Sequence, residues 1–116
     1  MTPTTLVIGA TAQAREAAIA SRLDATADTA LILEGLPSGN PVLAENPGLR
    51  ISRIAPGCLC CTGNLTMRVT LNRILRKPPQ RLFIGLATSD HVDNLRSFLA
   101  QAPYDDLLEL TQDLQA

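Results

Sequence analysis

The chain has few aromatic residues and no strong excess of charge of either sign. Its 116 residues include no tryptophan, one tyrosine and two phenylalanines, and the formal net charge is -1. Proteins that bind single-stranded nucleic acid usually stack the bases on aromatic side chains, and they need a basic surface for the phosphate backbone. Nucleic acid is therefore not an expected partner, and the hydrophobic core must be built from aliphatic side chains.

Long hydrophobic runs are also missing. No apolar stretch approaches the roughly 18 residues that a membrane-spanning helix needs. The first five residues, MTPTT, lack the basic segment that opens a secretory signal. We therefore expect a cytoplasmic protein with no membrane partner. In that reducing compartment, clustered cysteines indicate metal or redox chemistry rather than a framework of disulfides.

Short apolar runs alternate with amphipathic segments along the chain, and turn-forming residues separate them. The pattern predicts strands at residues 4–9, 29–34, 49–55 and 81–87, and helices at residues 12–23, 64–77 and about 90–101. A further helix is expected after Pro103, where the leucines Leu107, Leu108, Leu110 and Leu114 follow. Strands that alternate with helices predict a three-layer α/β fold with a mostly parallel sheet of about four strands.

All three cysteines of the chain fall within four positions, as Cys58, Cys60 and Cys61. A buried, inert thiol would explain one cysteine but not a C-x-C-C cluster. The cluster directly follows a predicted strand, and ligand sites of parallel α/β folds gather beyond the carboxyl ends of the strands. It also precedes a predicted helix, whose positive N-terminal dipole lowers the pKa of a nearby thiol and favours the thiolate.

Two kinds of thiolate chemistry remain open for this segment. Soft sulfur ligands suit Zn²⁺ or another thiophilic metal, with a carboxylate, a histidine or water in the fourth position of a zinc site. Adjacent cysteines rarely bind one ion without strain, so Cys58 paired with Cys61 or with Cys60 is the simplest ligand pair. Alternatively, Cys58 and Cys60 could close a small disulfide ring that responds to oxidation.

The first predicted strand ends where a phosphate-binding loop, G-x-x-x-x-G-K-[ST], would follow it. The corresponding residues 9–16 read GATAQARE, so Gly9 matches, while Ala14, Arg15 and Glu16 replace the second glycine, the lysine and the hydroxyl residue. A carboxylate at the last position repels phosphate, and an alanine restricts a backbone that glycine leaves free.

Together these segments resemble the nucleotide-binding domain of the CobW-type GTPases, relatives of the nickel chaperones UreG and HypB. Residues 56–62, PGCLCCT, resemble the family signature N-G-C-[IL]-C-C-[ST], and the following helix resembles the family pattern D-L-x-x-x-L-x-x-[IL]. Weaker similarity surrounds this motif. Glu34 matches an acidic residue of the family. His91 matches a histidine of some members, although the surrounding residues 83–92, FIGLATSDHV, otherwise differ from the family motif.

The resemblance implies a P-loop-like fold, with residues 1–116 as a single CobW-like domain that lacks the C-terminal part of the family. It also implies a metal site at Cys58, Cys60 and Cys61, with Glu34 at the same sheet edge as a candidate further ligand. His91 is the other candidate, because it is the one histidine of the chain. GTP is not expected to bind, because the loop that contains Gly9 and Arg15 is degraded and the guanine-reading motif [NT]-K-x-D is absent from the 116 residues. The sequence therefore predicts a non-enzymatic protein that stores, delivers or senses zinc.

Two alternatives to a zinc protein stay open. One is a pseudo-GTPase that docks on a protein partner, with incidental cysteines, and the other is a thiol redox switch. We also predict a homodimer, because a sheet of about four strands leaves an edge that invites association.

Overall fold

The computed structural model describes residues 2–9, 11–22, 28–34, 49–54, 65–86, 92–101 and 104–116. Its strands are β1 (Thr2–Ile8), β2 (Thr29–Glu34), β3 (Leu49–Ile54), β4 (Arg81–Leu86), β5 (Leu108–Leu110) and β6 (Leu114–Gln115). Its helices are α1 (Ala12–Ala20), α2 (Leu65–Leu75), α3 (Val92–Leu99) and α4 (Tyr104–Leu107). No helix in this described part of the chain is long and apolar enough to cross a membrane.

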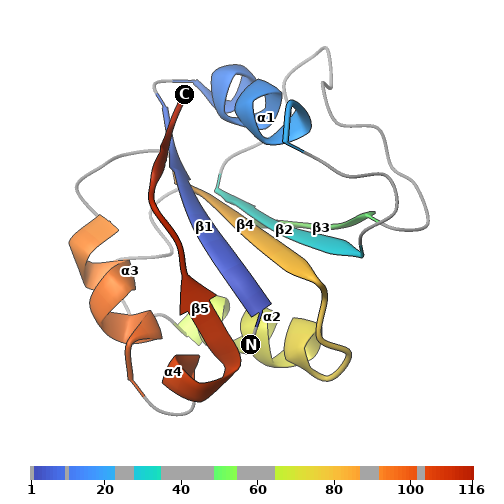
Figure 1. The fold of residues 1–116 in the computed structure, drawn as a ribbon, viewed down its shortest axis with the longest axis vertical. Helices are drawn as coiled ribbons and strands as arrows, with labels where there is room; N and C mark the ends of the chain where they lie inside the picture. The colour runs from blue at the N-terminus through green and yellow to red at the C-terminus, as the bar shows by residue number, and fades with distance from the viewer. Residues whose placement is uncertain are drawn as a thin grey trace.

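The strands form one sheet in the order β3-β2-β4-β1-β5, and β6 also pairs with β1 (Figure 1). Every pairing is parallel. The four longer strands are the four that the hydrophobic pattern predicts, and the α/β class with a parallel sheet is confirmed. Strand β2 is buried along its whole length, as expected for a strand with layers on both faces.

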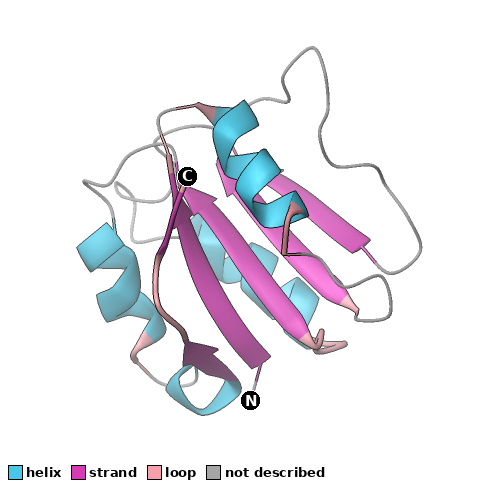
Figure 2. Cartoon of the chain, turned by 45° about the horizontal axis from the view of Figure 1, so that its top comes forward, coloured by secondary structure: helices cyan, strands magenta, loops and turns pink. Residues whose placement is uncertain are grey.

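Helices cover both faces of the sheet, which gives three layers (Figure 2). One face packs against α2, α3 and α4 through a large aliphatic cluster that includes Leu6, Ile32, Ile84, Leu71 and Leu95. The opposite face carries α1, whose Ile19 packs with Val7, Leu31, Leu33 and Phe83. The second cluster is smaller because, in the described part of the chain, the nine-residue α1 is the helix that packs there.

The prediction of a final helix after Pro103 is wrong beyond its first turn. Only α4 is helical, and the chain then continues as β5 and β6 beside β1. The backbone N–H groups of Thr111 and Ala116 donate to the carbonyl groups of Thr4 and Ile8, at 2.9 and 2.7 Å. These bonds pair the outer edge of β1, whose polar groups would otherwise lack a partner. Long-range pairing therefore overrides the helical spacing of the leucines.

Tyr104 joins α4 to the core and gives a spectroscopic test of this packing. Its ring lies 5.2 Å from that of Phe98, and its hydroxyl donates to Asn72 at 3.0 Å. Burial raises the pKa of Tyr104 above its ordinary value of 10.0, and the charge of Arg68 partly opposes the shift. The stability that neutral Tyr104 contributes is therefore complete below pH 10.0, and it is lost as the pH rises through the folded-state pKa.

We expect the tyrosinate absorbance of the native protein to titrate with a midpoint above 10.0. The signal is unambiguous because the chain has one tyrosine and no tryptophan. In concentrated denaturant the midpoint should return to the ordinary value. Equal midpoints in the two conditions would contradict the burial of Tyr104.

Candidate functional site

The junction between β1 and α1 differs in geometry from a phosphate-binding loop. Helix α1 begins at Ala12, and the side chain of the N-cap residue Thr11 accepts a hydrogen bond from the Ala14 N–H at 3.0 Å. The Arg15 N–H donates to the Thr11 carbonyl at 3.1 Å. In a phosphate-binding loop the backbone N–H groups instead surround the phosphates. Here the N–H groups of Ala14 and Arg15 are already used by the helix and its cap.

The Arg15 side chain turns back over the carboxyl end of the sheet. Its Nη1 donates to the Gly9 carbonyl at 2.7 Å, and its Nη2 donates to the Glu34 carbonyl at 3.3 Å. One guanidinium group therefore connects the ends of β1 and β2. The space over Gly9 is also filled, because a Cβ built on Gly9 would lie 3.0 Å from Cγ of Arg15 and 2.8 Å from Cβ of Ala116.

Two buried carboxylates accompany Arg15, which is itself only 5% exposed. Glu16 and Glu34 are each 2% exposed, and Glu16 Oε1 forms an ion pair with Nη2 of Arg53 at 3.0 Å. Burial lowers the pKa of Arg15, while the charges of Glu34 and Glu16 raise it. The two arginines and two glutamates balance in charge, so these four residues, which we call the Arg15 cluster, need no external counter-ion for neutrality.

One atom of the Arg15 cluster is poorly satisfied. Oε2 of Glu16 is buried and has no hydrogen-bond partner among the residues that the structure describes. The stability of the cluster therefore depends on the positive charges of Arg15 and Arg53, because a buried carboxylate without a compensating charge costs folding free energy.

The predicted metal ligands fall mostly outside the described residues. This applies to Cys58, Cys60, Cys61 and His91. The remaining candidate, Glu34, is the last residue of β2, and the register pairs it with Ile54 at the end of β3. Cys58 follows Ile54 by four positions in the sequence. Within the segments that the structure describes, no group of three or more His, Cys, Asp or Glu residues could hold a metal ion.

Sequence reasoning identified Gly9, Arg15 and Glu34 but missed Arg53. The sequence predicted only a strand at residues 49–55, and nothing in the local pattern pairs Arg53 with a glutamate 37 positions earlier. The sequence did indicate that Glu16 would oppose phosphate. It carried no signal that Glu16 would be buried in an ion pair.

The fold and the junction define a parallel α/β domain of P-loop-like architecture with an internally neutral charge cluster at the carboxyl edge of the sheet.

Over 73 residues, the chain is 32% identical to the protein described as "Zinc chaperone YeiR" from Escherichia coli strain K12. The match covers 62% of this chain and 22% of the length of YeiR. It supports the relationship to CobW-type proteins that the cysteine motif suggests. No protein-family model matches the chain. No solved structure matches it either.

Proposed function

We propose that this chain is a CobW-like zinc-binding domain that works in zinc delivery, storage or sensing without hydrolysing GTP. The observation that carries the proposal is the similarity to a zinc chaperone over 62% of the chain. The cysteine cluster supports it independently, because three thiolates within four positions suit a thiophilic metal such as Zn²⁺.

Cys58 and Cys61 are the main proposed ligands, with Cys60 as a third thiolate. Glu34 is a candidate for a further position because it ends the strand that pairs with β3, the strand that leads toward the cysteines. Its side chain is buried near the positive charge of Arg15. His91 is the other candidate, and it is the one histidine of the chain.

Loss of GTP hydrolysis is proposed from the Arg15 cluster. In a phosphate-binding loop, free backbone N–H groups and a lysine after the first strand bind the phosphates of a nucleoside triphosphate. Here the Ala14 and Arg15 N–H groups are bonded to Thr11, and the Arg15 guanidinium is bonded to two backbone carbonyls. The buried carboxylate of Glu16 would further repel phosphate oxygens.

The ligand assignment is tested by titrating reduced protein with Zn²⁺ against a chromophoric chelator. We expect about one equivalent to bind, as for a single structural-type zinc site. Replacing Cys58 and Cys61 by serine together should weaken binding by roughly a hundredfold or more, since even loss of a residue that only orients a ligand costs 10–100-fold.

Thr62→Ser is the matched control, because it changes the same segment and leaves every thiol in place. It should bind zinc like the unchanged protein. Zinc affinity that survives the double cysteine replacement would refute the assignment. Failure of the unchanged protein to bind zinc, together with peroxide-dependent loss of two thiols, would favour the redox switch instead.

A further inference from the structure

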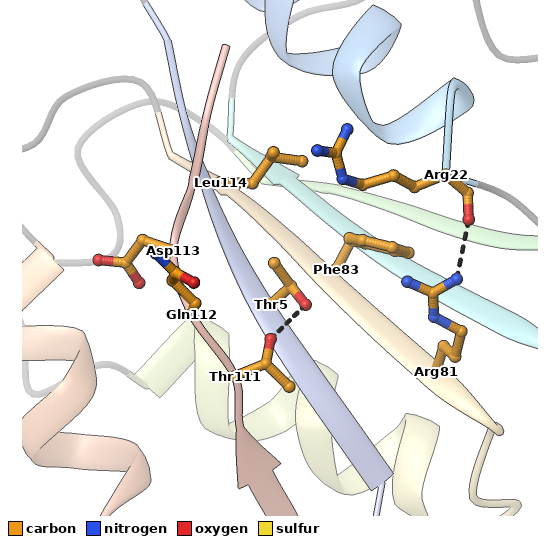
Figure 3. A pocket seen from close by; sticks show the side chains of 8 residues that line it. All are labelled: Thr5, Arg22, Arg81, Phe83, Thr111, Gln112, Asp113 and Leu114. Atoms are coloured by element: carbon orange, nitrogen blue, oxygen red, sulfur yellow. Dashed lines mark hydrogen bonds between the residues drawn. The ribbon is translucent and has the colours of Figure 1, made fainter.

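A second site lies on the α1 face of the sheet, away from the Arg15 cluster. It is a pocket of about 420 Å³ beyond the C-terminal end of α1, lined by Thr5, Arg22, Arg81, Phe83 and the four residues from Thr111 to Leu114 (Figure 3). This volume is in the range of sites that hold small molecules. The lining is mostly polar. Phe83 is only 1% exposed and lies under the Arg81 guanidinium, so Leu114 is the apolar side chain of this lining that a ligand can reach.

The charge of the pocket is positive. Arg22 reaches across it toward Leu114, and the Arg81 guanidinium lies beside Phe83 (Figure 3). Asp113 is the one acidic residue of the lining, and its carboxylate points away from both arginines and pairs with Arg96 of α3. In the described part of the chain, neither Arg22 nor Arg81 forms a salt bridge with a carboxylate.

Arg81 is held in position before any ligand arrives. Its Nη1 donates to the Arg22 carbonyl at 2.8 Å, and its guanidinium carbon lies 4.7 Å from the centre of the Phe83 ring. The hydroxyls of Thr5 and Thr111 are hydrogen-bonded to each other at 2.6 Å on the opposite wall. An arginine fixed in this way loses little side-chain entropy on binding, and its planar fork suits a carboxylate or phosphate group.

We propose that this pocket binds a small organic anion, whose carboxylate or phosphate head pairs with Arg22 and Arg81 while its apolar body rests against Leu114. The proposal is independent of the zinc function, since none of the lining residues is a candidate metal ligand. Among the residues that the structure describes, neither arginine pairs with a carboxylate, which favours an anion over a neutral or cationic ligand.

The test is a nuclear magnetic resonance titration of the full chain with benzoate and with its neutral analogue benzamide. Benzoate should give saturable shifts of the amide signals of Phe83, Thr111 and Leu114, with an affinity of about 1 mM as for a small fragment. Benzamide should give no saturable shifts there. Inorganic phosphate should bind more weakly than benzoate, and equal affinity would overturn the apolar part of the proposal.

Arg81→Gln and Arg22→Gln should each weaken benzoate binding roughly tenfold, as expected for the loss of a charged hydrogen bond. Arg22→Gln is the more informative variant, because the hydrogen bond from Arg81 ends on the backbone carbonyl of Arg22 and is retained. Arg76→Gln, an exposed position just after α2, is the matched control and should bind benzoate normally. Equal binding of benzoate and benzamide, or unchanged binding by Arg22→Gln, would overturn the proposal.

Discussion

Replacing Arg15 by methionine should lower the free energy of unfolding by about 3 kcal/mol, because it removes a buried positive charge that offsets the buried carboxylates near it. Methionine fills a similar volume but makes neither of the hydrogen bonds to the Gly9 and Glu34 carbonyls. It also leaves the buried carboxylates of Glu16 and Glu34 without the charge of Arg15. Arg53 would then be the remaining cation of the cluster.

Chemical denaturation of Arg15→Met, Arg15→Lys and Arg22→Met measures this effect. Lysine keeps the charge but concentrates its donors on one nitrogen, so we expect it to lose about 1 kcal/mol, the worth of one hydrogen bond. Arg22→Met is the control at an exposed arginine and should change stability by less than about 0.5 kcal/mol. A loss for Arg15→Met as small as that of the control would contradict the structural role of the Arg15 cluster.

The first strand-to-helix junction shows how much of this cluster the sequence could predict. Gly9, Arg15 and Glu16 were recognisable as departures from a phosphate-binding loop, because that motif has a fixed spacing along one segment. The partners of Arg15 and Glu16 were not recognisable. They lie on β2 and β3, and their approach depends on the order of strands in the sheet.

Leu108→Ala should destabilise the protein by about 3 kcal/mol, whereas Leu107→Ala should cost less than about 1 kcal/mol. The two leucines are adjacent, yet Leu108 is 4% exposed in the core against α2 and α3, and Leu107 is 42% exposed. Truncation at Leu108 removes buried methyl groups and leaves a cavity. Truncation at Leu107 removes surface that water already reaches.

This pair also separates the observed strand from the helix that the leucine pattern predicts. In a helix, Leu107, Leu110 and Leu114 would share one face, so Leu107 would be buried with them. In the structure, β5 pairs with β1 and turns Leu108 inward. Thermal or denaturant unfolding of both alanine variants measures the difference. Equal losses, or a larger loss for Leu107→Ala, would contradict the strand at this position.

The central strands were predictable because each is a short, nearly continuous apolar run bounded by turn residues, and burial on both faces requires such a run. Strands β5 and β6 were not, since three-residue and two-residue strands carry almost no periodicity of their own. Their conformation follows from the free edge of β1. The homodimer predicted from unpaired edges is still a prediction, although β5 and β6 cover one side of β1.

The cysteine motif at residues 58–61 could be recognised from the sequence alone. Three thiols within one short segment are close together in any fold, and thiolates are soft ligands that bind thiophilic metals. The identity of a fourth ligand depends on tertiary placement. Glu34 lies at the carboxyl edge of the sheet and pairs in register with Ile54 at the end of β3, and its role as a metal ligand is still a prediction.

Zinc affinity measured with and without GTP and Mg²⁺ tests the proposed function most directly, because a nucleotide-driven chaperone must couple the two ligands. Calorimetry on the reduced 116-residue chain would give both affinities in one experiment. We predict about one equivalent of Zn²⁺ with the same affinity in both conditions, and no heat of binding from GTP and Mg²⁺ alone. Absence of zinc binding, or a zinc affinity that changes about tenfold or more when GTP is added, would contradict a zinc site that works without nucleotide.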